Sequence, residues 1–299
     1  RPSAKVRALA SRQASLQQRR AATTVRMASD EQQQQTQLTD PESGRRCVDG
    51  ECVMIDGKCE TIATAADEVA EPAASLERQV FAEFLGTAFL VCTIIGSGMM
   101  GDNLSPDDGV ALLGNTLATW GILYVLITTL GPISGAHFNP VVSCCFWLKR
   151  ELGGAAFALF VPAQVFGAVF GAFVAHAMFM RRNGVFDGKD RDSDGELFSE
   201  FVATFGLLMT IFGGIRAKKD VPMLVGLYIT AGYWFTSSTS FANPAVTIGR
   251  SFTDTFASIS PKSFPAYFAG QVLGLLCGLP ACEWLFSRKA PLAALATLA

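Results

Sequence analysis

The chain has 299 residues, of which half are hydrophobic and only 17% are charged. Its 28 Gly and 23 Phe accompany four Tyr and four Trp, a composition typical of a protein that crosses a membrane several times. The formal net charge of -2 gives no sign of a polyanionic partner, so nucleic-acid binding is not expected. The sequence shows no nucleotide-binding loop, no metal-ligand cluster in its apolar body and no Ser-His-Asp set in a supporting context. We therefore expect a protein that is not an enzyme and needs no cofactor.

Residues 1–28 contain six Arg, one Lys and no acidic residue. This Arg-rich and acid-poor composition predicts a cleavable organelle transit peptide. Its end, Val25-Arg26-Met27-Ala28, is similar to the end of a plastid transit peptide, so a plastid membrane is the expected location. A mitochondrial address, a plasma-membrane location and a simple disordered basic tail remain as alternatives.

Residues 29–78 form a polar leader with little to bury, and we expect it to be disordered. Three cysteines in it alternate with two Asp-Gly pairs: Cys47, Asp49-Gly50, Cys52, Asp56-Gly57 and Cys59. The Asp-Gly pairs favour a small hairpin-like turn unit. The thiols suit a soft metal, a metalloid or a disulfide, but their spacing fits no zinc pattern. The alternative is a flexible tail with redox-labile thiols.

Six apolar runs in residues 79–287 are long enough to cross a bilayer, which takes about 20 apolar residues. They cover residues 80–100, 110–131, 153–180, 197–215, 221–239 and 265–286. An Asn-Pro pair follows the second run and another follows the fifth. Asn is a favoured helix N-cap, and Pro fits the first helical position. Residues 141–148 and 245–252 are therefore expected to form two helices too short to span.

The two halves of the body repeat one another. Residues 83–87 (EFLGT) recur as residues 200–204 (EFVAT), and residues 164–167 (QVFG) recur as 271–274 (QVLG). Each copy holds three spans, so the second copy inserts upside down relative to the first. The expected fold is an all-α membrane protein of six transmembrane helices plus two re-entrant half-helices in an inverted repeat. Repeat one covers residues 79–181, repeat two covers 196–287, and a tail follows at 288–299.

Loop charge predicts the orientation of the chain. Cations gather in the loops that share a side with the leader. They are Lys149, Arg150, Arg216, Lys218, Lys219, Arg288 and Lys289. On the opposite side, the cations of residues 181–191 alternate with five acidic residues. Both termini are therefore expected to face the cytoplasm, or the stroma of a plastid.

At residues 79–287 the sequence resembles the aquaporin, or major intrinsic protein, family. The resemblance rests on AEFLGT at 82–87, SGAHFNP at 134–140, NPA at 243–245 and the two Gln-Gly helices. It implies a homotetramer with one pore in each subunit. Two positions depart from the common pattern: Val141 replaces Ala in the first Asn-Pro-Ala motif, and Val246 stands where most members carry a filter Arg. With its NPAVTIGR run, the chain resembles an atypical, mainly bacterial branch, some members of which are linked to arsenic handling.

The pore centre is expected at the two Asn-Pro motifs. Their residues are Asn139, Pro140, Val141, Asn243, Pro244 and Ala245. Both asparagines have amide donors for a passing oxygen, and the positive ends of both half-helices repel cations. Glu83 and Glu200 are charges inside spans, and their repeated positions favour a role in bracing the re-entrant loops. His137, whose counterpart is Phe241, suits a loop brace or a pH gate.

The family spacing places the narrow selectivity filter on the second span, the fifth span and the second loop. The candidates are Thr119 with Trp120 beside it, Gly232 or Tyr233, Ser240 and Val246. Arg250 lies four residues after Val246 and shares its helix face. Either it lines the outer vestibule, or it is a cation near the C-terminus of the half-helix with Asp254 one turn on.

We expect a passive channel for water and small uncharged solutes, with glycerol, urea and neutral metalloid acids such as arsenous acid as candidates. An inverted-repeat secondary transporter is the first alternative, but it would need a coupling site that only Glu83 and Glu200 could supply. A non-conducting structural protein of the membrane is the second.

Overall fold

The computed structural model describes residues 52–55, 58–61, 74–181 and 188–286. The expected transit peptide and the C-terminal tail lie outside the described residues. The chain divides into two compact units, Arg1–Pro72 and Ala73–Ala299, which are described separately. In the first unit, strands β1 (Cys52–Ile55) and β2 (Lys58–Thr61) pair antiparallel, with Ile55 opposite Lys58. The paired strands lie where the Asp-Gly pairs favour a small hairpin-like unit, within a leader expected to be disordered as a whole.

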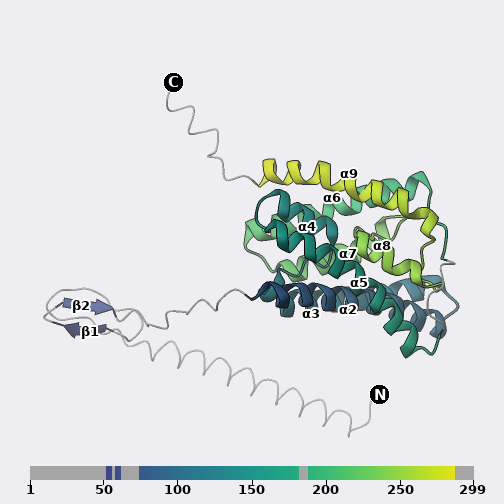
Figure 1. The fold of residues 1–299 in the computed structure, drawn as a ribbon, viewed down its shortest axis with the longest axis horizontal. Helices are drawn as coiled ribbons and strands as arrows, with labels where there is room; N and C mark the ends of the chain where they lie inside the picture. Colours follow the sequence, from purple (N-terminus) through teal and green to yellow (C-terminus); the bar gives the residue numbers. More distant parts are fainter. Residues whose placement is uncertain (1–51, 56–57, 62–73, 182–187, 287–299) are drawn as a thin grey trace, which may run out of the picture. The chain divides into compact units, whose positions relative to one another are not determined.

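The second unit is built from helices (Figure 1). In chain order they are α2 (Leu76–Leu104), α3 (Asp108–Ser134), α4 (Pro140–Leu148), α5 (Gly154–Met178), α6 (Asp194–Ala217), α7 (Val221–Phe235), α8 (Pro244–Gly249) and α9 (Phe264–Leu285). Two single 3-10 turns, η1 (Arg250–Phe252) and η2 (Pro261–Ser263), precede α9. The eight-residue stretch expected to be helical after the second Asn-Pro motif (residues 245–252) is therefore a short α-helix continued by a 3-10 turn.

Five of these helices are long and apolar enough to cross a membrane by length and composition. The fifth expected span differs, because α7 has only 15 residues and ends at Phe235 rather than near residue 239. At 1.5 Å per residue it is about 22 Å long, less than the roughly 30 Å hydrocarbon core. The backbone becomes extended at Thr236 (φ -111°, ψ 141°), where the chain turns toward the second Asn-Pro motif.

The two halves pack alike. In the first half α2 lies against α3 and α5, and in the second half α6 lies against α7 and α9. The α2–α5 contact depends on glycine: a Cβ at Gly167 would lie 2.3 Å from the carbonyl oxygen of Phe84, and one at Gly171 would lie 2.2 Å from that of Ala88. The two Gln-Gly patterns therefore mark the places where helix backbones touch, as small residues commonly do in membranes.

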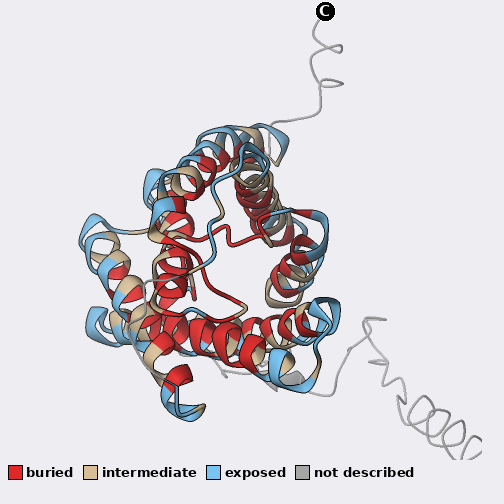
Figure 2. Ribbon diagram, turned by 90° about the vertical axis from the view of Figure 1, so that its right-hand side faces the viewer, coloured by how far each residue is buried: buried red, intermediate tan, exposed pale blue. Residues whose placement is uncertain are grey.

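Figure 2 shows the helices of the second unit as a ring whose inward faces are buried, with two buried loop segments crossing its middle. Large apolar side chains such as Phe81, Phe166 and Leu276 remain more than half exposed on the helices. A polar solvent would penalise that surface, whereas lipid would not. The chain is therefore built as an integral, multi-pass membrane protein.

Candidate pore and constriction

Each half-helix begins where its Asn-Pro pair predicts. The side-chain oxygen of Asn139 accepts a hydrogen bond from the amide of Val141 (2.9 Å), and Pro140 opens α4. The oxygen of Asn243 accepts from the amides of Ala245 (3.0 Å) and Val246 (3.3 Å). These caps use the asparagine oxygens and leave both amide nitrogens free to donate elsewhere.

Those amide nitrogens tie the two re-entrant loops together. Asn139 donates to the carbonyl oxygen of Ala242 (2.7 Å), and Asn243 donates to that of Phe138 (2.8 Å). Each amide carries two N–H groups, so one hydrogen on each asparagine is left after the cross-link. The reciprocal bonds fix the tips of α4 and α8 against each other in the middle of the body.

Two buried glutamates, Glu83 and Glu200, bind the backbone amides of these loops. The carboxylate of Glu83 accepts bonds from the hydroxyl of Ser134, the amides of His137 and Phe138, and the side chain of Gln164, at 2.7–2.9 Å. The carboxylate of Glu200 has a matching set of partners at 2.6–2.8 Å: Ser238, Phe241, Ala242 and Gln271. Four bonds to each carboxylate offset the cost of burying a charge with no exposed surface.

Both re-entrant loops contain non-glycine residues in the left-handed backbone conformation, which such residues rarely adopt. Ala136 and Phe138 have φ values of 50° and 48° in the first loop. Ser240 and Ala242 have φ values of 51° and 46° at the matching places in the second. A left-handed non-glycine residue costs about 1–2 kcal/mol. The glutamate bonds to the neighbouring amides keep this strained backbone in place, a pattern that often accompanies a functional site.

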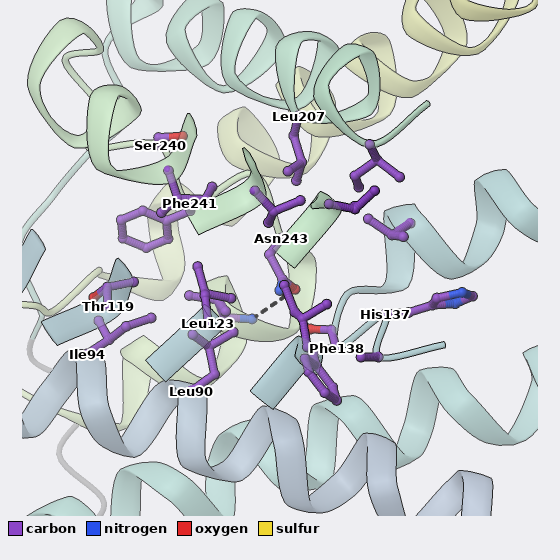
Figure 3. Close-up of a pocket in the computed structure, with 18 of the residues that line it drawn as sticks. Leu90, Ile94, Thr119, Leu123, His137, Phe138, Leu207, Ser240, Phe241 and Asn243 are labelled. Carbon is purple, nitrogen blue, oxygen red and sulfur yellow. Dashed lines mark hydrogen bonds between the residues drawn. The ribbon is translucent and has the colours of Figure 1, made fainter. Parts of the chain in front are cut away.

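A cavity of about 150 Å³ runs past these loops between the two halves. Aliphatic side chains from the long helices make most of its wall: Leu90, Ile94, Leu123, Ile127, Leu207, Ile211, Val225 and Ile229. Its polar side chains are fewer: Thr119, His137, Tyr233, Ser240, Asn243 and Arg250. Figure 3 shows Leu90, Leu123 and Leu207 around Asn243, with Phe241 and Ser240 farther along the cavity. Asn139, by contrast, does not line it.

The structure distinguishes between the adjacent candidates for the narrow ring. Thr119 and Tyr233 line the cavity, and their hydroxyls lie 3.2 Å apart. Trp120 and Gly232 do not line it. The indole of Trp120 packs on Gly226, where a Cβ would lie 2.5 Å from its ring, and Gly232 lies against the side chain of Ser240. The hydroxyl of Ser240 is buried without a hydrogen-bond partner among the described residues.

Arg250 reaches the same cavity from the 3-10 turn η1, just beyond the end of α8. It is only 3% exposed and lines the cavity together with Val246. Its Nε donates to the carbonyl oxygen of Ala257, and its guanidinium carbon lies 3.5 Å from the ring centroid of Phe241. Of the two placements that the sequence leaves open, the structure therefore shows Arg250 at the cavity. No recorded ion pair joins Arg250 to Asp254, which is exposed.

His137 and its counterpart Phe241 occupy matching loop positions but have different surroundings. The Nδ1 atom of His137 lies 3.1 Å from the hydroxyl of Ser143 in α4, and its ring stacks on Phe146. Phe241 instead packs edge-on against Tyr267 and beneath Arg250. Phe241 also lines the cavity. It is not among the filter candidates that the sequence predicts, although its place between Ser240 and Asn243 is sufficient to suggest it.

Three comparisons relate this chain to known proteins. A family model described as "Major intrinsic protein" matches residues 71–237. The chain is 50% identical over 218 residues to aquaglyceroporin AqpS of Rhizobium meliloti (strain 1021), covering 73% of this chain and 94% of that protein. It is 30% identical over 210 residues to aquaporin NIP1-1 of Oryza sativa subsp. japonica, covering 67% and 72%.

Among solved structures, the X-ray structure of the aquaglyceroporin from Plasmodium falciparum matches with a TM-score of 0.57 and 22% sequence identity. The match covers 74% of this chain and all of that chain. At this identity the likeness shows a common fold.

Proposed function

Because the chain belongs to the major intrinsic protein family, we propose that it is a passive channel for water and small uncharged solutes such as glycerol. The observation that supports this most directly is the cavity, which passes between two half-helices that begin at Asn139 and Asn243. A re-entrant helix inside a membrane is tolerated where it is packed in protein or lines a water-filled cavity.

The lining suits a solute with both hydroxyl and hydrocarbon parts. Asn243, Ser240 and Arg250 offer hydrogen-bond donors on the side of the loops, while aliphatic side chains of α2, α3, α6 and α7 face them. A polyol can donate and accept along the polar strip while its carbon atoms contact the aliphatic wall. The positive ends of the half-helices and the Arg250 charge oppose cations at the same place.

We propose that the narrow filter consists of Thr119, Tyr233, Ser240, Phe241 and Val246, with Arg250 as its cation. Helical side chains point back toward the N-terminus, so a residue one turn after Val246 reaches the space beside it. The contacts of Arg250 with Phe241 and with the carbonyl of Ala257 support this placement. Arg250 would then replace the charge that Val246 lacks.

Stopped-flow flux through purified protein in vesicles tests the function. We expect water and glycerol permeabilities well above that of vesicles made of lipid alone. The same assay with urea and neutral metalloid acids then ranks the solutes. Arg250→Val should raise the ratio of glycerol to water permeability, because it removes a bulky donor from the ring. An unchanged ratio in a folded variant would place the filter elsewhere.

The alternatives have distinct outcomes in the same vesicles. A secondary transporter would show solute flux that depends on an ion gradient. A non-conducting structural protein would show no water flux above that of lipid alone.

A homotetramer and a plastid address are also part of this proposal. Cross-linking and size-exclusion chromatography with light scattering should give four chains per particle, whereas a monomer would contradict the proposed homotetramer.

The plastid address has its own test. Residues 1–78 fused to a fluorescent reporter should direct the reporter to plastids in a photosynthetic host. Diffuse cytosolic fluorescence would rule out the address, and mitochondrial fluorescence would favour the alternative address.

A further inference from the structure

A second arginine, Arg191 in the connection between α5 and α6, lies near Phe241, although it does not itself line the cavity. Residues 188–191 of this connection run along residues 258–263 and bond to them. Lys189 donates its amide to the hydroxyl of Ser258 (3.1 Å) and accepts from the amide of Ser260 (2.7 Å), and the amide of Arg191 donates to the hydroxyl of Ser263 (2.7 Å). The backbone of Arg191 is thus fixed to the same segment that positions Arg250.

Neighbouring carbonyls hold the two arginine side chains. The Nε of Arg250 donates to Ala257, and the Nε of Arg191 donates to Ser258 at 3.0 Å. The guanidinium carbons lie 3.5 Å and 5.6 Å, respectively, from the ring centroid of Phe241. They are therefore no more than about 9 Å apart, which is within about one Debye length at ordinary ionic strength.

Among the described residues, neither arginine forms an ion pair with a carboxylate. Within the described parts of the chain, the one recorded ion pair joins Lys149 and Glu151, at the end of α4. Asp190 and Asp192 flank Arg191 in the sequence, but both are exposed and neither forms an ion pair with it. In the same described residues, the only recorded hydrogen bond from the guanidinium of Arg250 is the one from Nε, although this side chain is 3% exposed.

A buried cation is usually paired, and two cations close together favour an anion between them. Each guanidinium has further N–H donors in a fork that fits the oxygens of a carboxylate or a sulfate. The unpartnered hydroxyl of Ser240 lies on the same cavity and could donate to the same ligand.

We propose that Arg191 and Arg250 form a binding site for a small oxyanion, of the carboxylate or sulfate kind, at this mouth of the cavity. The oxyanion occupies the entrance without needing to pass, so it competes there with neutral solutes. This site goes beyond the channel function, because binding at the mouth does not depend on flux.

Calorimetric titration of the detergent-solubilised full chain with sodium sulfate, at constant ionic strength in sodium chloride, tests the site directly. Wild type should show saturable binding of one sulfate per chain. Arg191→Gln should weaken binding about tenfold, which corresponds to about 1.4 kcal/mol. Arg191→Lys, which retains the charge but loses the planar fork, should give an intermediate affinity.

Lys218→Gln is the matched control. Lys218 is the residue that caps the C-terminus of α6, and this variant also removes one cation. Its sulfate affinity should equal that of wild type. Absence of saturable binding to wild type, or equal affinity in wild type and Arg191→Gln, would overturn the proposal. Equal weakening by Lys218→Gln would do the same, because it would reduce the effect to net charge.

Two further measurements keep the result independent of folding and of conduction. The unfolding temperature of each variant is measured in chloride and in sulfate. Because sulfate stabilises folded proteins in general, the variants are compared by how much their unfolding temperature rises in sulfate. This rise should be smaller in Arg191→Gln and Arg191→Lys than in Lys218→Gln. In vesicles, sulfate should slow water flux through wild type more than through Arg191→Gln. Vesicles without any flux would contradict the channel function, while the calorimetry would still decide the anion site.

Discussion

The two re-entrant loops have the same scaffold but present different side chains to the cavity. In both, a buried glutamate accepts four hydrogen bonds, an asparagine caps a half-helix, and alternate residues have left-handed backbone. The first loop carries His137 and is followed by nine residues of α4. The second carries Phe241 and is followed by a six-residue α8 and the buried Arg250. The repeat therefore supplies the frame, and the differences between its copies supply the chemistry of the cavity.

The largest expected effect comes from removing either brace. Glu83→Ala and Glu200→Ala each leave several buried donors without an acceptor, at about 1–3 kcal/mol for each donor. Because the two networks match, both variants should lose most of the folded protein in detergent, as judged by thermal unfolding and by monodisperse yield. Glu151→Ala, which removes a half-exposed acid, should behave like wild type. A stable, folded Glu200→Ala protein beside an unfolded Glu83→Ala protein would break the equivalence of the loops.

Asn243→Asp should reduce neutral-solute flux and admit cations, with a larger effect than Asn139→Asp. The substitution replaces an amide donor with an anion, loses the bond to Phe138 and lowers the barrier to cations. Asn243 lines the cavity and Asn139 does not, which is why the matched variants should differ. Solute flux and ionic conductance are measured together at equal membrane abundance. If both match wild type, Asn243 is not in the solute path.

Val246→Arg should lower the ratio of glycerol to water permeability by about tenfold, a scale typical of discrimination by small steric differences. The added guanidinium must share the ring with Arg250, so the space for a solute larger than water decreases. The double variant Val246→Arg with Arg250→Val moves the cation back by one turn, and its ratio should lie between those of wild type and the single variant. A ratio that stays unchanged or rises in folded Val246→Arg would show that Val246 is not at the constriction.

The smallest effect is expected from Ser240→Ala. It removes a buried hydroxyl that has no partner among the described residues, so folding should change little and the unfolding temperature should stay near that of wild type. Glycerol flux should fall by a few-fold, since a solute loses one hydrogen bond worth about 1 kcal/mol. Ser237→Ala, in an exposed part of the same loop, provides the control. Equal glycerol flux in both variants would remove Ser240 from the proposed filter.

Local patterns in the sequence were sufficient to predict much of the structure that surrounds the cavity. The Asn-Pro pairs located both half-helix starts, because capping depends on residues only two or three positions apart. The repeated Glu and Gln-Gly patterns indicated which helices would pack and which loops would need an acceptor. Sequence hydropathy, however, extended the fifth span beyond Phe235, since an apolar run does not show where the chain must turn inward.

By itself, then, the sequence determined the inverted repeat, the half-helices and the pair of bracing glutamates, all of which follow from local or repeated patterns. Only the tertiary structure decided that Thr119 and Tyr233, rather than Trp120 and Gly232, face the cavity. It also decided that Arg191 and Arg250 meet at Phe241, although 59 residues of sequence separate the two arginines. The reason is physical: neighbouring residues on a helix point in directions about 100° apart, and only packing against distant elements fixes which of them faces inward.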